Sequence, residues 1–165
     1  MNVHSRLLGP AAFVLSLAGM AGGAHRVNTM SAAPLGACGL ITQQEAAKAL
    51  GAAVPAGTEK AMTLPLQGRS VKAEMCFYGS EVSVTRYALG STAEAYFTQY
   101  RQSLAGKSGY QDVKGLGDEA FAAKGQLTVR KGETQLIVDV GQARGGGAKE
   151  LDAEKALAVL ALGRL

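Results

Sequence analysis

Histidine is nearly absent from this sequence, and its absence removes several kinds of active site. The 165 residues include only His4 and His25, both within the first 25 positions. Hydrolases in which a histidine activates a serine or cysteine nucleophile are therefore excluded from the remainder of the chain. The two cysteines, Cys38 and Cys76, have no imidazole partners and cannot supply the four ligands of a zinc site. We expect neither an enzyme nor a bound cofactor or metal.

Aromatic residues and runs of basic residues are also scarce. Aromatics make up 5% of the chain, tryptophan is missing, and glycine is abundant at 22 residues. The hydrophobic share of 47% is typical of a folded domain, whose core we expect to consist of alanine, valine and leucine. The net charge of +4 comes from lysines and arginines that never form a run of five. Nucleic acid is therefore not an expected partner.

The first 24 residues have the organisation of a secretory signal peptide. Arg6 precedes an apolar stretch, and Gly-Gly-Ala at residues 22–24 supplies the small residues that precede a cleavage site. An uncleaved membrane anchor is the alternative, but the stretch is short and rich in glycine for a spanning helix. We divide the chain into a signal peptide at 1–24, a flexible linker at 25–37 and a single domain at 38–165. This division predicts an exported protein, either periplasmic or secreted.

Cys38 admits two main interpretations. Leu-Gly-Ala-Cys at residues 35–38 resembles a lipobox, in which the cysteine is lipidated and the protein is anchored to a membrane. However, a polar segment at residues 25–34 separates Cys38 from the apolar stretch, whereas lipid is attached where that stretch inserts. A disulfide with Cys76 suits the oxidising compartment of an exported chain and would stabilise the fold by roughly 4 kcal/mol. We favour the disulfide; a lipidated Cys38, with membrane contact, and two free thiols are the alternatives.

Local patterns predict three helices. The segment 42–51 opens with a T-x-x-E capping box and closes on a glycine. The segment 91–106 opens with an S-x-x-E box and also closes on a glycine. A third helix is predicted at 150–162, with an apolar face formed by Ala153, Ala156, Leu157 and Leu160.

Alternating hydrophobic residues between these helices predict strands. The segment 61–67 is a weak candidate, restricted by Pro65 to the edge of a sheet. The segments 71–78 and 81–89 flank a Gly-Ser turn, and the segment 113–141 holds three short strands separated by Lys-Gly turns. The order of elements predicts an α+β fold, with a mostly antiparallel sheet of five to six strands and helices packed on one side.

One glycine-rich motif matches a dinucleotide-binding pattern only in its letters. Residues 115–120, Gly-Leu-Gly-Asp-Glu-Ala, precede a predicted strand instead of joining a strand to a helix. Their two carboxylates would also repel a pyrophosphate. We therefore expect no nucleotide site at this motif.

The carboxylates offer an alternative reading as an enzyme that works without histidine. This reading requires Asp118, Glu119 or Asp139 to gather in one cleft with a shifted pKa. Glu150 and Glu154 lie one helical turn apart, and we expect them on the solvated surface.

The chain resembles a family of exported bacterial proteins, largely actinobacterial and many of them lipoproteins, whose function is unknown. The resemblance lies in Cys-Gly-Leu-Ile-Thr at residues 38–42, the helical segment that follows, the Cys-x-aromatic strand at Cys76, and Gly-Leu-Gly-Asp-Glu-Ala. It covers residues 36–162 and implies an exported α+β domain, a Cys38–Cys76 bridge and no catalytic residues. Here the motif cysteine itself stands in the lipobox-like string, whereas a lipidated member would carry a separate, earlier cysteine. This departure favours a soluble periplasmic or secreted form.

These observations predict an exported, non-enzymatic domain of the cell envelope or the secreted fraction with a binding role. The expected partner is an unknown protein or a small apolar or envelope ligand, which binds the sheet face or loops. Phe77, Tyr78 and Tyr87 are the candidate residues of that face. A lipid-anchored accessory protein of the envelope is the alternative that depends on Cys38.

Overall fold

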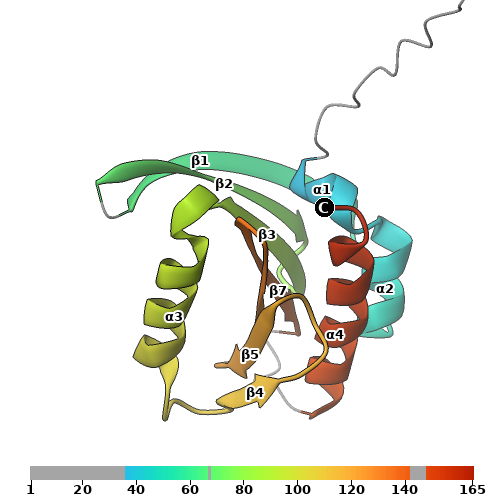
Figure 1. Cartoon of the computed structure of the whole chain (residues 1–165). Helices are drawn as coiled ribbons and strands as arrows, with labels where there is room; N and C mark the ends of the chain where they lie inside the picture. The colour runs from blue at the N-terminus through green and yellow to red at the C-terminus, as the bar shows by residue number, and fades with distance from the viewer. Residues whose placement is uncertain (1–35, 67, 142–147) are drawn as a thin grey trace, which may run out of the picture. The chain divides into compact units, whose positions relative to one another are not determined.

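A computed structural model describes residues 36–66, 68–141 and 148–165 (Figure 1). The predicted signal peptide at 1–24 and the linker residues 25–35 lie outside the described residues. Ala37, which we placed in the linker, begins the first helix and is buried. Residues Ala33–Leu165 form one compact unit. Its elements are α1 (Ala37–Leu40), α2 (Gln43–Leu50), β1 (Thr58–Leu66), β2 (Arg69–Tyr78), β3 (Val82–Ala88), the 3₁₀ turn η1 (Gly90–Thr92), α3 (Ala93–Leu104), β4 (Gln111–Val113), β5 (Glu119–Ala123), β6 (Gln126–Lys131), β7 (Thr134–Val140) and α4 (Ala148–Leu162).

The strands form one antiparallel sheet in the order β1-β2-β3-β7-β6-β5-β4. Two meanders, β1-β2-β3 and β4-β5-β6-β7, meet where β3 pairs with β7. The α+β class and the antiparallel sheet are confirmed, with seven strands instead of five to six. The additional strand is β4, a three-residue strand at one edge. The weak candidate around Pro65 is confirmed as the opposite edge, β1, and is longer than expected.

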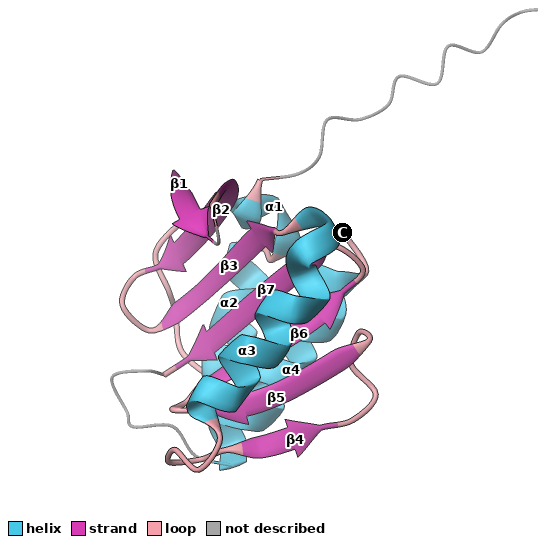
Figure 2. Cartoon of the chain, turned by 60° about the vertical axis from the view of Figure 1, so that its left-hand side comes forward, coloured by secondary structure: helices cyan, strands magenta, loops and turns pink. Residues whose placement is uncertain are grey.

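The helices lie on both faces of the sheet, not on one as we expected (Figure 2). The main core joins α1, α2 and α4 to the face that carries Val84, Leu127 and Val138. On the other face, Phe97 of α3 packs edge-on against Phe121 of β5, with ring centroids 5.4 Å apart. Because successive residues of a strand point to opposite faces, β5 contributes to both cores.

The start of α2 follows the predicted capping box. Thr42 accepts a hydrogen bond from the backbone N–H of Glu45 at 3.2 Å, and Glu45 accepts one from the Thr42 N–H at 2.7 Å. Gly51 ends the helix in the left-handed conformation, with φ of 73°. The second predicted box is wrong: Ser91 lies inside η1, and α3 begins after Thr92 without a side-chain cap.

A disulfide joins Cys38 of α1 to Cys76 of β2, with Cα atoms 4.9 Å apart. It ties the first helix to the middle of the first meander. Gly57 covers the bridge so closely that a Cβ there would lie 2.7 Å from the Cys76 sulfur. The predicted bridge is therefore present. Because its sulfur is committed to the bridge, Cys38 has no thiol left for a lipid.

The buried side of α4 differs from the predicted apolar face. Ala156 and Leu160 are exposed, although both were assigned to the face that packs on the core. The second half of the helix, residues 156–162, is apolar on all sides, so helical periodicity alone did not identify its inner side. The buried side consists of Leu151, Glu154, Leu157, Ala158, Ala161 and Leu162.

Candidate functional site

The β1–β3 end of the sheet leaves part of one face accessible. One cross-strand row runs from Lys60 through Met75, Thr85 and Ile137 to Thr128. Thr128 is buried on the side of α3, whereas the β1, β2, β3 and β7 members of the row are exposed or half-buried. The helix thus covers only the far end of this row. We call the accessible part the open face; it consists of Lys60, Met62, Met75, Phe77, Thr85 and Ile137.

Apolar side chains dominate the open face, and one cation lies on it. Met62 is 46% exposed, one of only four large hydrophobic side chains exposed among the described residues. The Lys60 Nζ lies 5.5 Å from the centre of the Phe77 ring, a cation–π contact. Methionine adapts its shape to different neighbours, so Met62 and Met75 suit a contact surface. The arrangement offers binding area and a positive charge.

The open face ends at β1, whose outer edge has no neighbouring strand among the described residues. β1 pairs with β2 over nine residues, and the first six of them are exposed. An edge strand presents backbone N–H and C=O groups that pair readily with another chain. Glu59, Lys60 and Pro65 are of the kinds that limit indiscriminate pairing at such edges. β1 is therefore available to pair with another strand, and its charged residues and proline restrict which strands can pair with it.

The structure separates the three aromatic residues that we assigned to a single face. Phe77 belongs to the open face, and Tyr87 lies on the same side but packs with Tyr96 of α3. Burial raises the pKa of the Tyr87 hydroxyl. Tyr78 points to the opposite face, where it is buried and donates a hydrogen bond to the Ile41 carbonyl. Adjacent strand residues cannot share a face, so Phe77 and Tyr78 could not have formed one surface.

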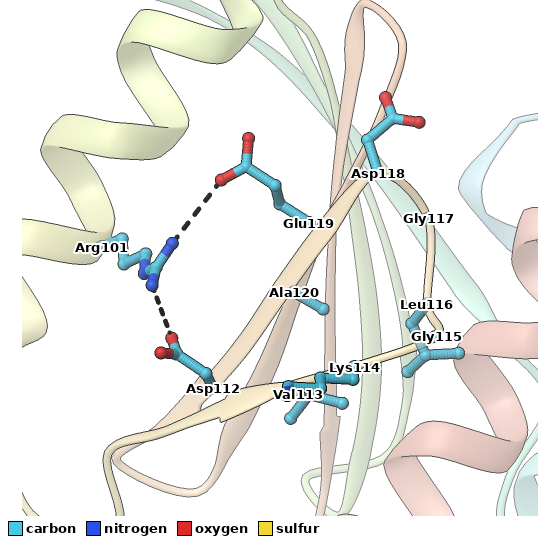
Figure 3. Close-up of a pocket in the computed structure, with 10 residues that line it drawn as sticks. All are labelled: Arg101, Asp112, Val113, Lys114, Gly115, Leu116, Gly117, Asp118, Glu119 and Ala120. Atoms are coloured by element: carbon cyan, nitrogen blue, oxygen red, sulfur yellow. Dashed lines mark ion pairs between the residues drawn. The ribbon is translucent and has the colours of Figure 1, made fainter.

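A cavity of about 310 Å³ lies beside the Gly-Leu-Gly-Asp-Glu-Ala segment and contains a network of ion pairs (Figure 3). Arg101 of α3 is paired with Asp112 at 2.9 Å and with Glu119 at 3.6 Å. The hydrogen bond from the Arg101 Nε to the Tyr110 hydroxyl, with the charge of Asp112, raises the pKa of Arg101. Glu119 forms a second ion pair, with Arg130, at 2.8 Å. The acids and arginines at the cavity are thus paired with one another.

The same segment has a clear structural role. The Asp118 carboxylate accepts hydrogen bonds from Arg130 and from the Gly132 N–H at 2.7 Å, which fastens the β4–β5 loop to the β6–β7 turn. Gly117 has φ of +56°, and a Cβ there would overlap the Arg130 carbonyl oxygen. Asp139 does not line this cavity; it accepts a hydrogen bond from Gln126 at 3.2 Å. The three acids of the enzyme alternative are therefore not gathered together.

Sequence reasoning missed a buried acid, Glu154, which we expected on the surface. It is 2% exposed, and its Oε1 accepts a hydrogen bond from the Val140 N–H at 3.3 Å. Burial, with the negative charges of Asp139 and Glu150, raises its pKa to about 8. The available signal was its spacing: Glu154 stands one turn after Leu151 and one turn before Ala158, on the buried side of α4.

Comparison with known proteins adds no relative. No family model, no curated protein and no solved structure matches this chain. Among the helices of the described residues, none is long and apolar enough to cross a membrane.

Proposed function

We propose that this chain is an exported, non-enzymatic binding domain that captures an extended segment of a partner protein by strand addition at β1. The observation that carries the proposal is the nine-residue edge strand, which is exposed and borders the open face. In strand addition, backbone hydrogen bonds supply affinity, and contacts to alternate side chains supply specificity. β1 offers both kinds of contact in one place.

The side chains of β1 define the partner segment. A strand added beside β1 places every second side chain next to Lys60, Met62 and Leu64, on the side of the open face. Apolar partner residues suit Met62 and Leu64, and an acidic residue suits Lys60. Arg69 of β2 is exposed on the same side, whereas the one exposed acid of β1, Glu59, points to the opposite side. We therefore assign a partner segment whose residues on the side of the open face, at every second position, are acidic beside Lys60 and apolar beside Met62 and Leu64.

The remaining parts of the proposal have weaker but independent support. The disulfide suits an oxidising compartment, in agreement with export. The acids and arginines of the Gly-Leu-Gly-Asp-Glu-Ala cavity are paired with one another, which suits a structural role better than catalysis. The function thus rests on β1 and not on a reactive side chain.

Peptide selection followed by nuclear magnetic resonance (NMR) mapping tests the proposal. Decapeptides selected from a random displayed library should carry an acidic residue with apolar residues two and four positions away from it. On binding, the largest amide shifts should lie in residues 59–64 of β1. Met62→Asp should weaken binding at least tenfold, because it puts a charge where the partner presents an apolar residue and brings it close to the acidic partner residue beside Lys60. Val159→Asp is the matched control, since it changes an equally exposed apolar residue on α4 and should leave binding unchanged.

Two results would overturn the proposal. Selected peptides that shift amides elsewhere, or that bind the Met62→Asp variant equally well, would remove β1 as the binding element. A concentration-dependent dimer that the same peptides dissociate would show that a second copy of this chain occupies β1, in place of a different partner.

A further inference from the structure

A second cavity, distant in the fold from the open edge, lies between α4 and the β5–β6 turn. Its volume is about 480 Å³, within the range of small-molecule sites. Ser108 and Gln111 precede or begin β4, Lys124 and Gln126 flank the β5–β6 turn, and Glu154 comes from α4. Polar side chains from three parts of the chain thus surround one space, and one of them is the Glu154 carboxyl, which is only 2% exposed.

The charges around this cavity are predominantly negative. Glu150 and Glu154 line it from α4, and Asp139 of β7 acts on Glu154 electrostatically. Lys124 is the one cationic side chain among the described residues that line the cavity. Among the described residues, the Glu154 carboxyl accepts a hydrogen bond from the Val140 N–H and forms no ion pair with a cation. Burying an acid in this setting is costly to the fold, because a buried charge is tolerated only when it is paired.

We propose that this cavity binds a small primary alkylammonium ligand, with Glu154 as the counter-ion. The ammonium group would replace the proton that burial holds on the Glu154 carboxyl, and so pair a charge that meets no cation among the residues that the structure describes. Its remaining N–H groups match acceptors on the walls, namely the amide oxygens of Gln111 and Gln126 and the hydroxyl of Ser108. The alkyl chain has Ala122 and Leu151 as apolar neighbours.

The same residues disfavour a metal ion as the ligand. Among the residues that the structure describes, no three histidine, cysteine or carboxylate side chains are grouped closely enough to hold one. The cavity is also much larger than a coordinated ion needs, since one water molecule takes only about 30 Å³ of liquid volume. A ligand with one cationic end and an apolar chain fits the lining better than a bare cation.

Titration with n-butylammonium tests this inference, and n-butanol is its uncharged counterpart. In NMR spectra of the unit Ala33–Leu165, which has its own core, the ammonium should give saturable shifts at residues 124–126 and at Val140. Butanol should give none. An alkylammonium, like the lysine side chain, stays charged to about pH 10. Because binding requires Glu154 to lose its proton, whose pKa is about 8, the affinity should rise about tenfold from pH 6 to 7 and level off above about pH 8.

A matched pair of variants assigns the effect to Glu154. Glu154→Gln keeps the size and the acceptor of the side chain and should abolish both the binding and its pH dependence. Glu150→Gln removes a neighbouring charge and should weaken binding while keeping the pH dependence. Equal shifts with butanol, binding that does not change with pH, or binding retained in Glu154→Gln would each overturn the assignment.

Discussion

Replacing Glu154 by glutamine should make the protein more stable at neutral and alkaline pH. The pKa of this carboxyl is about 8 in the folded chain, against 4.5 as its ordinary value. The folded state therefore binds the proton more tightly than the unfolded state does. The stability that this proton supports is complete below pH 4.5, is lost as the pH rises, and is gone above about pH 8. Glutamine has no proton to lose and removes this dependence.

The magnitude follows from the size of the pKa shift. One pKa unit corresponds to about 1.4 kcal/mol, so the full loss is at most about 5 kcal/mol. About 3 kcal/mol of it has already occurred at pH 7. A typical domain has a free energy of unfolding of only about 5–15 kcal/mol, so the effect is large enough to measure.

Urea unfolding followed by far-ultraviolet circular dichroism, at pH 5, 7 and 9 and constant ionic strength, measures the effect. The two proteins should be close in stability at pH 5, and the variant should gain on the parent at each higher pH. Glu133→Gln, in an exposed turn, is the control and should follow the parent. Parallel pH curves for the parent and Glu154→Gln would refute the reasoning, because Glu154 would then ionise as it does in water.

Three further changes should alter stability for independent reasons. Replacing both bridged cysteines by alanine opens a link between residues 38 positions apart and should lower the free energy of unfolding by about 4 kcal/mol, measured by urea unfolding. The hydrogen bond and charge of Arg164 lower the pKa of Glu45 to about 2, so the stability that this pair contributes should be lost as the pH falls from 4.5 towards 2; acid titration of Glu45→Gln should show a shallower decline. Gly117→Ala should lower the melting temperature more than Gly115→Ala, because both have positive φ but only Gly117 would place its Cβ against another backbone; equal melting temperatures would contradict the close approach.

Features that depend on neighbouring residues were predictable from the sequence. The capping box of α2 needs only Thr42 and Glu45 three positions apart, and the structure contains both of its hydrogen bonds. Pro65 restricted its strand to an edge, because proline has no backbone N–H to donate to a neighbouring strand. The bridge followed from two cysteines in a chain that we expected to be exported. Each of these rules acts over a short range or on a very small set of residues.

Features that depend on which face of the sheet each helix packs against were not predictable in the same way. Strand alternation places Phe77 and Tyr78 on opposite faces, which our assignment of both to one face overlooked, and it does not show which face a helix covers. α3 connects β3 to the far edge strand β4 and crosses the face opposite α4, a path that its own periodicity does not specify. The prediction for Glu154 was wrong for a related reason. The second half of α4 is apolar on all sides, and we assumed that a charged residue faces water. The open face and the Glu154 cavity therefore needed the structure.

The division of the sheet into two meanders also sets the order in which the protein can fold. Within each meander, neighbouring strands are joined by short turns, so their pairing closes only small loops. The seam between β3 and β7 is different, because it joins Val84 to Val138 across all of α3 and most of the second meander. Such long-range pairing is intrinsically slow, since the chain loses its loop entropy before the contacts form. We therefore expect the seam to limit the folding rate, so that truncating Val138 at the seam, or Met75 in the meander that forms before it, slows folding more than it speeds unfolding.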